Sequence, residues 1–173
     1  AAARIPVLPA VLGERRTIGP LSWQVLWPPP SFLPAVAEDE EPNNASVVMF
    51  VRVAGLTALL AGDLEPPAQR QLLAMYPGLP AVDVLKVAHH GSAYQDPALL
   101  QRLSPRLAVI SSGRDNPYGH PSPRTIAALR STGAAVLRTD VHGTVTVLGG
   151  PAELQVASER MPPGVGPAWD AGP

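Results

Sequence analysis

The sequence contains no cysteine and few aromatic or charged residues. The absence of cysteine excludes a disulfide framework and a thiolate metal site, so a metal ion would have to be held by His, Asp or Glu. Aromatic residues make up only 5% of the chain, which leaves little material for stacking on nucleic-acid bases. The formal net charge is −1, which argues against bulk electrostatic attraction to nucleic acid.

The sequence also lacks a long hydrophobic run. No stretch reaches the ~18–20 apolar residues that cross a bilayer, and the start of the chain lacks the charged-then-apolar pattern of a signal peptide. Hydrophobic residues nevertheless make up 46% of the 173 residues, which is too apolar for a disordered chain. The 22 prolines and 15 glycines indicate many turns. We therefore expect one soluble domain with a modest core.

The near-zero net charge hides a segregation of charge along the chain. Residues 102–138 contain six arginines and one acidic residue, a local charge of +5 that the flanking segments offset. These arginines are consistent with solvent-exposed helix faces and strand ends. They are also consistent with a patch that faces phosphate groups, and the sequence does not decide between the two interpretations.

Short apolar runs separated by turn residues predict the secondary structure. Strands are predicted at residues 21–27, 46–53, 56–61, 83–87, 106–111, 135–139 and 144–148. The runs 46–53 and 56–61 indicate a hairpin, and residues 140–143 a second hairpin turn. Helices are predicted to begin at Pro66, Pro97 and Pro123, the last two after the capping residues Asp96 and Ser122.

These elements define the expected architecture and its boundaries. Strands with little alternation that are joined by helices indicate a mixed sheet covered by helices, in an α/β or α+β fold. We expect a loose or residual segment at residues 1–18, the domain at 19–150, and a Pro- and Gly-rich tail at 151–173. One further strand is predicted at 153–156, and a proline-rich and acidic surface loop at 28–42.

Polar residues follow three successive predicted strands, where the active groups of such sheets collect. These clusters are Gly62–Asp63, His89–Ser92 and Asn116–His120. Each has a structural alternative: Asp63 as a helix cap, the two histidines as a hydrogen-bonded pair, and the third cluster as a plain turn. His142 is interpreted as a hairpin residue. Together, however, three histidines and an aspartate at consecutive strand ends favour a site for zinc or manganese.

Several motifs resemble a known family. LLAGDLE, DVLKVAHHGS, VISSGRDNPYGHP and LRTDVHGTVTV, with VLWPP and NNASVVMFV upstream, are similar to the carboxy-terminal metallo-β-lactamase-like domain of ComEC-type competence proteins, which take up DNA. The resemblance covers about residues 19–148. It implies an αββα sandwich that binds one or two divalent metal ions, zinc or manganese, between two sheet edges.

The resemblance also assigns roles to residues. It implies that Asp63 is the metal-bridging aspartate and that His89 is the last histidine ligand of the metal. His90 then lies at the edge of the metal or on the substrate, and His120 contacts the substrate, so that these four residues form the catalytic set. The remaining candidates are predicted to bind substrate: Ser92, Arg114, Asn116, Tyr118 and Arg124.

One family motif is missing. The superfamily's main ligand motif, His-x-His-x-Asp-His, does not occur, because no histidine precedes His89. In the family that motif lies amino-terminal to the part seen here, so the resemblance implies the second half of the domain, and we expect the isolated chain to be inactive.

For the complete domain the resemblance implies a metal-dependent phosphodiesterase or nuclease. Its expected partners are single-stranded DNA and the membrane-embedded channel of the same protein, on the outer face of a bacterial cell membrane. No organic cofactor is expected. Two alternatives stay open: a non-catalytic scaffold or binding domain of a membrane DNA channel, and a metallohydrolase of a small phosphodiester or ester.

Overall fold

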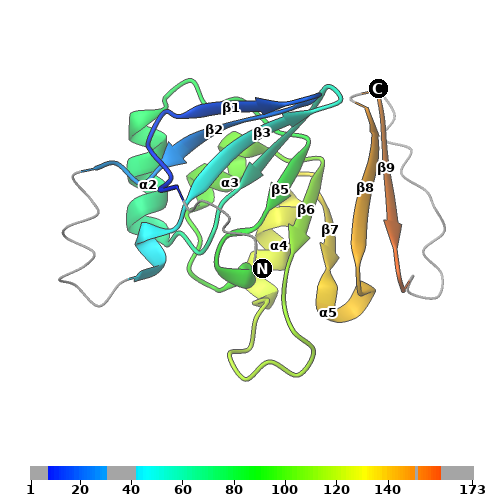
Figure 1. Ribbon diagram of the computed structural model, residues 1–173. Coiled ribbons are helices and arrows are strands. Elements are labelled where there is room, and N and C mark those ends of the chain that lie inside the picture. The colour runs from blue at the N-terminus through cyan, green and yellow to red at the C-terminus, as the bar shows by residue number, and fades with distance from the viewer. Residues whose placement is uncertain (1–7, 31–41, 151, 161–173) are drawn as a thin grey trace, which may run out of the picture.

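The computed structural model describes residues 8–30, 42–150 and 152–160, which are organised around a seven-stranded mixed sheet (Figure 1). Spatial order follows chain order: β1 Arg15–Ile18, β2 Leu21–Trp27, β3 Val48–Val53, β4 Leu56–Leu60, β5 Val84–Lys86, β6 Leu107–Ile110 and β7 Ala135–Arg138. Neighbours from β1 to β4 are antiparallel and those from β4 to β7 are parallel. The predicted mixed α/β fold is confirmed, and it is consistent with part of an αββα sandwich.

Three helices connect the parallel strands and lie on one face of the sheet (Figure 1). They are α2 Pro66–Met75, α3 Pro97–Leu103 and α4 Pro123–Ser131, and each begins with proline, which has no N–H group to leave unpaired. The predicted caps are confirmed, since the Asp96 and Ser122 side chains accept hydrogen bonds from the N–H groups of Ala98 and Arg124. Within the described residues, none of the helices has the length and apolar character needed to cross a membrane.

The core fills the space between the sheet and these helices. Leu59 on β4 and Leu85 on β5 are neighbours in register and project toward the helices, where they join Leu72 of α2 in one buried cluster. The same cluster includes residues from α3 and α4. Burial of each leucine side chain stabilises the fold by about 1.5–3 kcal/mol. The sheet edge that holds the candidate site is therefore anchored to a well-packed core.

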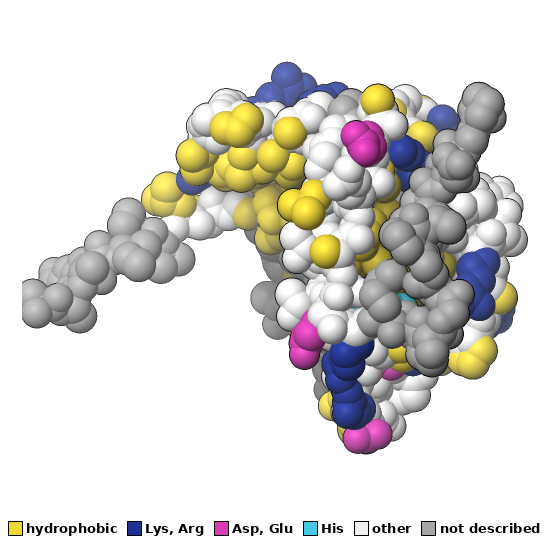
Figure 2. All heavy atoms as spheres, turned by 90° about the vertical axis from the view of Figure 1, so that its right-hand side faces the viewer, with side chains coloured by type: hydrophobic (Ala, Val, Ile, Leu, Met, Phe, Trp, Pro, Cys, Tyr) yellow, Lys and Arg dark blue, Asp and Glu magenta, His cyan; other side chains and the backbone are white. Residues whose placement is uncertain are grey.

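The opposite face of the sheet carries no helix. In Figure 2 hydrophobic side chains gather at the upper left, on the side that faces the viewer in Figure 1. By strand register, Trp23, Val51, Ala58 and Leu60 project from the face opposite to Leu59, and they are only half-buried. The β8–β9 hairpin, β8 Val145–Gly150 and β9 Glu153–Ser158, forms a separate two-stranded sheet beyond β7 (Figure 1). The strand predicted at 153–156 is confirmed.

The hairpin predicted at residues 140–143 is wrong. Thr139–His142 form a short helix, α5, and β8 pairs with β9 instead of β7. The Nδ1 atom of His142 lies 3.0 Å from the backbone nitrogen of Arg138 and 2.9 Å from its carbonyl oxygen, and the buried ring thereby holds the helical turn. Gly143, with φ of 70°, then redirects the chain away from the sheet.

The sequence predicted a loose segment at residues 1–18, and this prediction is wrong for the last four residues. Arg15–Ile18 form β1, which pairs with β2 in an antiparallel register from Arg15 opposite Gln24 to Ile18 opposite Leu21. Two consecutive arginines obscured this strand in the sequence, because an edge strand with one solvated face needs few apolar residues. Most of the loop predicted at 28–42 and the end of the tail, residues 161–173, lie outside the described residues.

Candidate functional site

The three predicted polar clusters meet at one edge of the sheet. Strands β4, β5 and β6 are parallel, so the segments after them leave the sheet on the same side. Asp63 follows β4, and His89 and His90 lie in the 3-10 turn η2, Ala88–Gly91, after β5. The backbone N–H of His89 donates to the carbonyl of Gly62 at 3.1 Å, which ties the first two clusters together.

Both histidines of the pair have a left-handed backbone. The φ angles are 46° at His89 and 52° at His90, a conformation that costs a non-glycine residue roughly 1–2 kcal/mol. The next residue, Gly91, is also left-handed and packs so closely that a Cβ atom there would lie 2.8 Å from the Cβ of Pro121. Strained backbone of this kind clusters at functional sites, because the rest of the fold must hold it in place.

This turn directs the two imidazoles at two carboxylates. Nε2 of His90 lies 3.5 Å from Oδ1 of Asp63, and Nδ1 of His89 lies 3.3 Å from Oε1 of Glu65. Nδ1 of His90 donates to the carbonyl of Ser111 at 2.6 Å, since a carbonyl oxygen can only accept, and this bond fixes the ring. The carboxylate beside His89 is therefore Glu65, while Asp63 faces His90.

Two residues of this cluster, Glu65 and Lys86, were not among the site residues predicted from the sequence. Glu65 accepts a hydrogen bond from the side-chain amide of Asn43 at 3.1 Å, which holds it toward His89. Nζ of Lys86 donates to the Gly62 carbonyl at 2.8 Å and lies 3.6 Å from Oδ1 of Asp63. Burial lowers the pKa of Lys86, and the Asp63 carboxylate offsets part of that effect. The sequence did contain a signal for Lys86, since a lysine at the end of an otherwise apolar strand is unusual.

His120 reaches the cluster from the loop after β6. Its ring centroid lies 5.4 Å from that of His89 in an edge-on arrangement, and the ring of Tyr118 stacks on it with a centroid distance of 6.2 Å. Burial lowers the pKa of His120, and the nearby His89 and His90 lower it further. The side chain of Asn116 shapes this loop, because its Oδ1 accepts from the His120 N–H at 3.1 Å and its Nδ2 donates to the His120 carbonyl at 2.5 Å.

Among the described residues, the side chains of Ser92, Arg114 and Arg124 make no hydrogen bond or ion pair with the side chains of this cluster. Ser92 is fully buried, and its carbonyl accepts a hydrogen bond from the Thr125 hydroxyl at 2.6 Å. Arg114 and Arg124 are exposed, and the structure gives neither an ion pair with a described residue. Tyr118 is 79% exposed. Figure 2 shows charged side chains at the tip of the molecule where this loop lies, so contact with a substrate at the tip stays a prediction.

The donor types suit a divalent metal, but the described residues alone do not complete a site. Carboxylate oxygen and imidazole nitrogen are ligands for zinc and manganese. Nδ1 of His89 is buried and forms no hydrogen bond, even though Oε1 of Glu65 lies 3.3 Å away, as expected of a nitrogen available to another ligand. Yet in the ranges that the structure describes, no three His, Asp or Glu side chains are arranged to hold a metal ion. Asp63 and His89 therefore stay predicted ligands.

The fold and this edge define the class of protein: a mixed α/β protein with paired acids and imidazoles after its parallel strands. Comparison with known proteins narrows the class. The chain is 36% identical to ComE operon protein 3 of Bacillus subtilis over 113 residues, which are 65% of this chain and 14% of that protein. It is 34% identical to competence protein ComA of Neisseria gonorrhoeae over 113 residues, 65% of this chain and 16% of that protein.

Recombination protein 2 of Haemophilus influenzae is 38% identical over 106 residues, 61% of this chain and 13% of that protein. No family model matches the chain. The chain thus spans less than a fifth of the length of each of these relatives. These similarities confirm the resemblance seen in the motifs: the chain is homologous to one segment of these proteins, which is consistent with a ComEC-like competence domain.

Proposed function

We propose that the chain supplies part of a DNA phosphodiester-cleaving site in a DNA-uptake protein. The observation that carries the proposal is the double pairing of acids with imidazoles, Asp63 with His90 and Glu65 with His89, on one strained turn. Homology to competence protein ComA, together with the resemblance to ComEC-type proteins that take up DNA, supports DNA as the substrate. The same relatives support a membrane-associated parent assembly, with the membrane-embedded channel as a partner.

The proposal includes one or two divalent ions, zinc or manganese. Asp63 and His89 would hold an ion together with ligands from outside the described residues, since the described ones do not complete a site. Such an ion, when bound, supplies Lewis-acid chemistry: it polarises a phosphoryl oxygen and makes water more acidic. The buried Nδ1 of His89, which lies beside Glu65 but forms no hydrogen bond, is the feature of this chain that supports the assignment.

The residues of the chain have separate tasks in this proposal. His90, held by the Ser111 carbonyl, positions the Asp63 carboxylate. His120 has a lowered pKa and is therefore neutral near neutral pH, which suits a group that accepts a proton from water or contacts the scissile phosphate. Arg114 and Arg124 would contact the DNA backbone without reading bases.

The test is cleavage of fluorescent single-stranded DNA with Mn²⁺ or Zn²⁺. It uses the 173-residue chain and the longest natural polypeptide that contains it. We expect the chain alone to be inactive, and Asp63→Asn or His89→Gln to reduce cleavage by the longer polypeptide at least 100-fold. His142→Gln, which changes a histidine outside the cluster, is the control and retains activity if folded. Cleavage that is unchanged by both cluster variants would overturn the proposal, as would robust cleavage by the chain alone.

A competition assay separates DNA from smaller substrates. A chromogenic phosphodiester that outcompetes single-stranded DNA would indicate a metallohydrolase of a small phosphodiester or ester instead.

One observation favours a second function, a non-catalytic binding or scaffolding domain. It is the lack of a three-donor metal group among the described residues. This function predicts that the purified longer polypeptide contains no zinc or manganese by elemental analysis, binds DNA, and does not cleave it. Stoichiometric metal together with cleavage would exclude it.

A further inference from the structure

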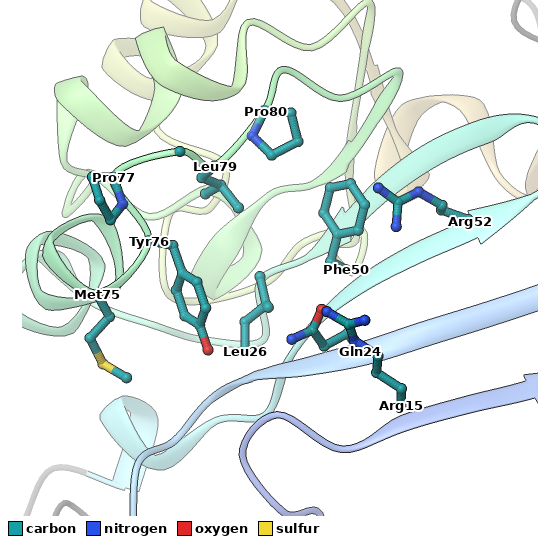
Figure 3. A pocket seen from close by; sticks show the side chains of 11 residues that line it. Arg15, Gln24, Leu26, Phe50, Arg52, Met75, Tyr76, Pro77, Leu79 and Pro80 are labelled. Atoms are coloured by element: carbon teal, nitrogen blue, oxygen red, sulfur yellow. The ribbon is translucent and has the colours of Figure 1, made fainter.

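A cavity of about 440 Å³ lies between the end of α2 and strands β1–β3 (Figure 3). Its strand side is lined by Arg15, Gln24, Phe50 and Arg52, and its helix side by residues that include Tyr76 and Leu79. A second hollow of about 280 Å³ shares the four strand residues with it and continues along the sheet. We call the two together the arginine groove.

Strand register places the polar and aromatic side chains of the groove on one face. Arg15 is opposite Gln24, and Gln24 is opposite Phe50, so the three side chains project from the same side of the sheet. Arg52, two residues after Phe50, projects from that side as well. Figure 3 shows Phe50 and Tyr76 on opposite sides of the cavity with Leu26 between them. The cavity therefore has an aromatic ring on each flank and cationic groups along the strands.

The described residues that line the groove carry net positive charge. None of the described residues that line either hollow is acidic. In the part of the chain that the structure describes, neither Arg15 nor Arg52 makes an ion pair, whereas Arg16 pairs with Glu14. The guanidinium carbon of Arg52 lies 4.8 Å from the centroid of the Phe50 ring. Planar guanidinium groups without acid partners are suited to bind phosphate oxygens in pairs.

These features fit a ligand that joins phosphate groups to flat, weakly polar rings. The volume is within the range of small-molecule pockets, roughly 300–1,000 Å³. We propose that the arginine groove binds nucleotide units of single-stranded DNA, with phosphates on Arg15 and Arg52 and a base against Tyr76 or Phe50. Base–aromatic stacking is tolerant of sequence, so this site would hold any strand. The choice of DNA over another nucleotide polymer rests on the proposed function.

The groove is separate from the Asp63 cluster. Arg52 is opposite Thr57 at the start of β4, whereas Asp63 follows the end of that strand. The three residue steps from Thr57 to the end of β4 at Leu60 span roughly 10 Å, and Asp63 lies in the turn beyond that end. A strand bound in the groove would therefore be held by nucleotides that are not being cleaved.

The test measures binding of a fluorescent oligothymidylate to the 173-residue chain by anisotropy over a series of salt concentrations. The double variant Arg15→Gln, Arg52→Gln is expected to bind at least tenfold more weakly. Its plot of log affinity against log salt should be shallower by about 1.4, because each phosphate contact on single-stranded DNA contributes about 0.7. Tyr76→Leu keeps an apolar side chain but loses the ring, and should weaken binding roughly tenfold with little change in slope.

Arg160→Gln is the matched control, because Arg160 is exposed just after β9 and lines neither hollow. It should bind like the unmodified chain, and circular dichroism verifies that each variant is folded. Wild-type affinity and slope in the double arginine variant would overturn the inference. It would also be overturned if that variant lost affinity for a glutamate-rich peptide but not for the oligonucleotide, since the groove would then bind an acidic protein.

A further variant separates this inference from the proposed function. Asp63→Asn should leave oligonucleotide binding unchanged, whatever its effect on cleavage. A loss of binding in Asp63→Asn equal to that in the double arginine variant would overturn the groove as a separate site.

Discussion

Nε2 of His90 lies 3.5 Å from Oδ1 of Asp63, although 27 positions separate the two residues in the sequence. Two features create this proximity: the parallel pairing of β4 with β5, and the left-handed turn that lifts the imidazole toward the carboxylate. Because the turn is strained, the positions that form it provide sensitive tests of the structure.

The left-handed backbone at His90 predicts that glycine is tolerated there better than alanine. Both His90→Gly and His90→Ala lose the contacts of the imidazole, so their difference reports the backbone alone. We expect the glycine variant to be more stable by about 1 kcal/mol, because a Cβ atom is unfavourable at φ of 52°. Urea unfolding of the two variants measures the difference. Equal stability, or a more stable alanine variant, would contradict the left-handed turn.

The close packing at Gly91 predicts a large cost for a single methyl group. In Gly91→Ala the new Cβ would lie 2.8 Å from Pro121 Cβ and 3.2 Å from Ile110 Cγ2, in a buried position. Gly119→Ala is the matched control, since Gly119 also has a positive φ but has open space around it. Overpacking should make Gly91→Ala roughly 1–3 kcal/mol less stable than Gly119→Ala in thermal or urea unfolding. Similar losses in both would show that His89 and His90 do not rest on a tightly packed turn.

The buried side-chain amide of Gln69 links α2 to the start of α3 through hydrogen bonds. Its Oε1 accepts from the Asp96 N–H at 2.7 Å, and its Nε2 donates to the Leu64 carbonyl at 2.6 Å. Gln69→Ala should destabilise the chain by about 2–4 kcal/mol, because it leaves both buried groups unpaired and opens a cavity. Gln101→Ala, at an exposed site on α3, should change stability by less than about 0.5 kcal/mol. The idea fails if the two variants unfold at the same urea concentration.

The lowered pKa of Asp83 predicts how the stability of the fold depends on pH. Burial by itself would raise the pKa of Asp83, but hydrogen bonds from Thr57 and Arg106 and the charge of Arg106 outweigh it, so the pKa is lowered. A carboxylate with a lowered pKa in the folded state stabilises the fold above its unfolded pKa of about 4. That contribution is lost as the pH falls through the folded value.

Asp83→Asn tests this dependence. At neutral pH the variant should be less stable by about 1–3 kcal/mol, since charge-assisted hydrogen bonds are lost. The gap to the unmodified chain should narrow as the pH falls below about 4. Unfolding free energies measured from neutral to acidic pH give both curves. Parallel curves would mean that the carboxylate is not held by Thr57 and Arg106.

The sequence by itself determined which segments form the candidate site. Asp63, the His89–His90 pair and His120 each follow an apolar run with turn residues, and parallel strands bring such ends to one edge whatever the details of packing. The helix starts at Pro97 and Pro123 were equally local, since proline and the preceding cap act within one turn.

Only the tertiary structure decided how these residues pair. Glu65 became the partner of His89 because Asn43, 22 positions earlier, holds its carboxylate, and no local pattern reports such a contact. The predicted hairpin at 140–143 failed for a related reason: the ring of His142 bonds the backbone of Arg138 and forms a helical turn. The arginine groove likewise depends on the register of three strands against the end of α2, a relationship between distant segments that arises only when the sheet assembles.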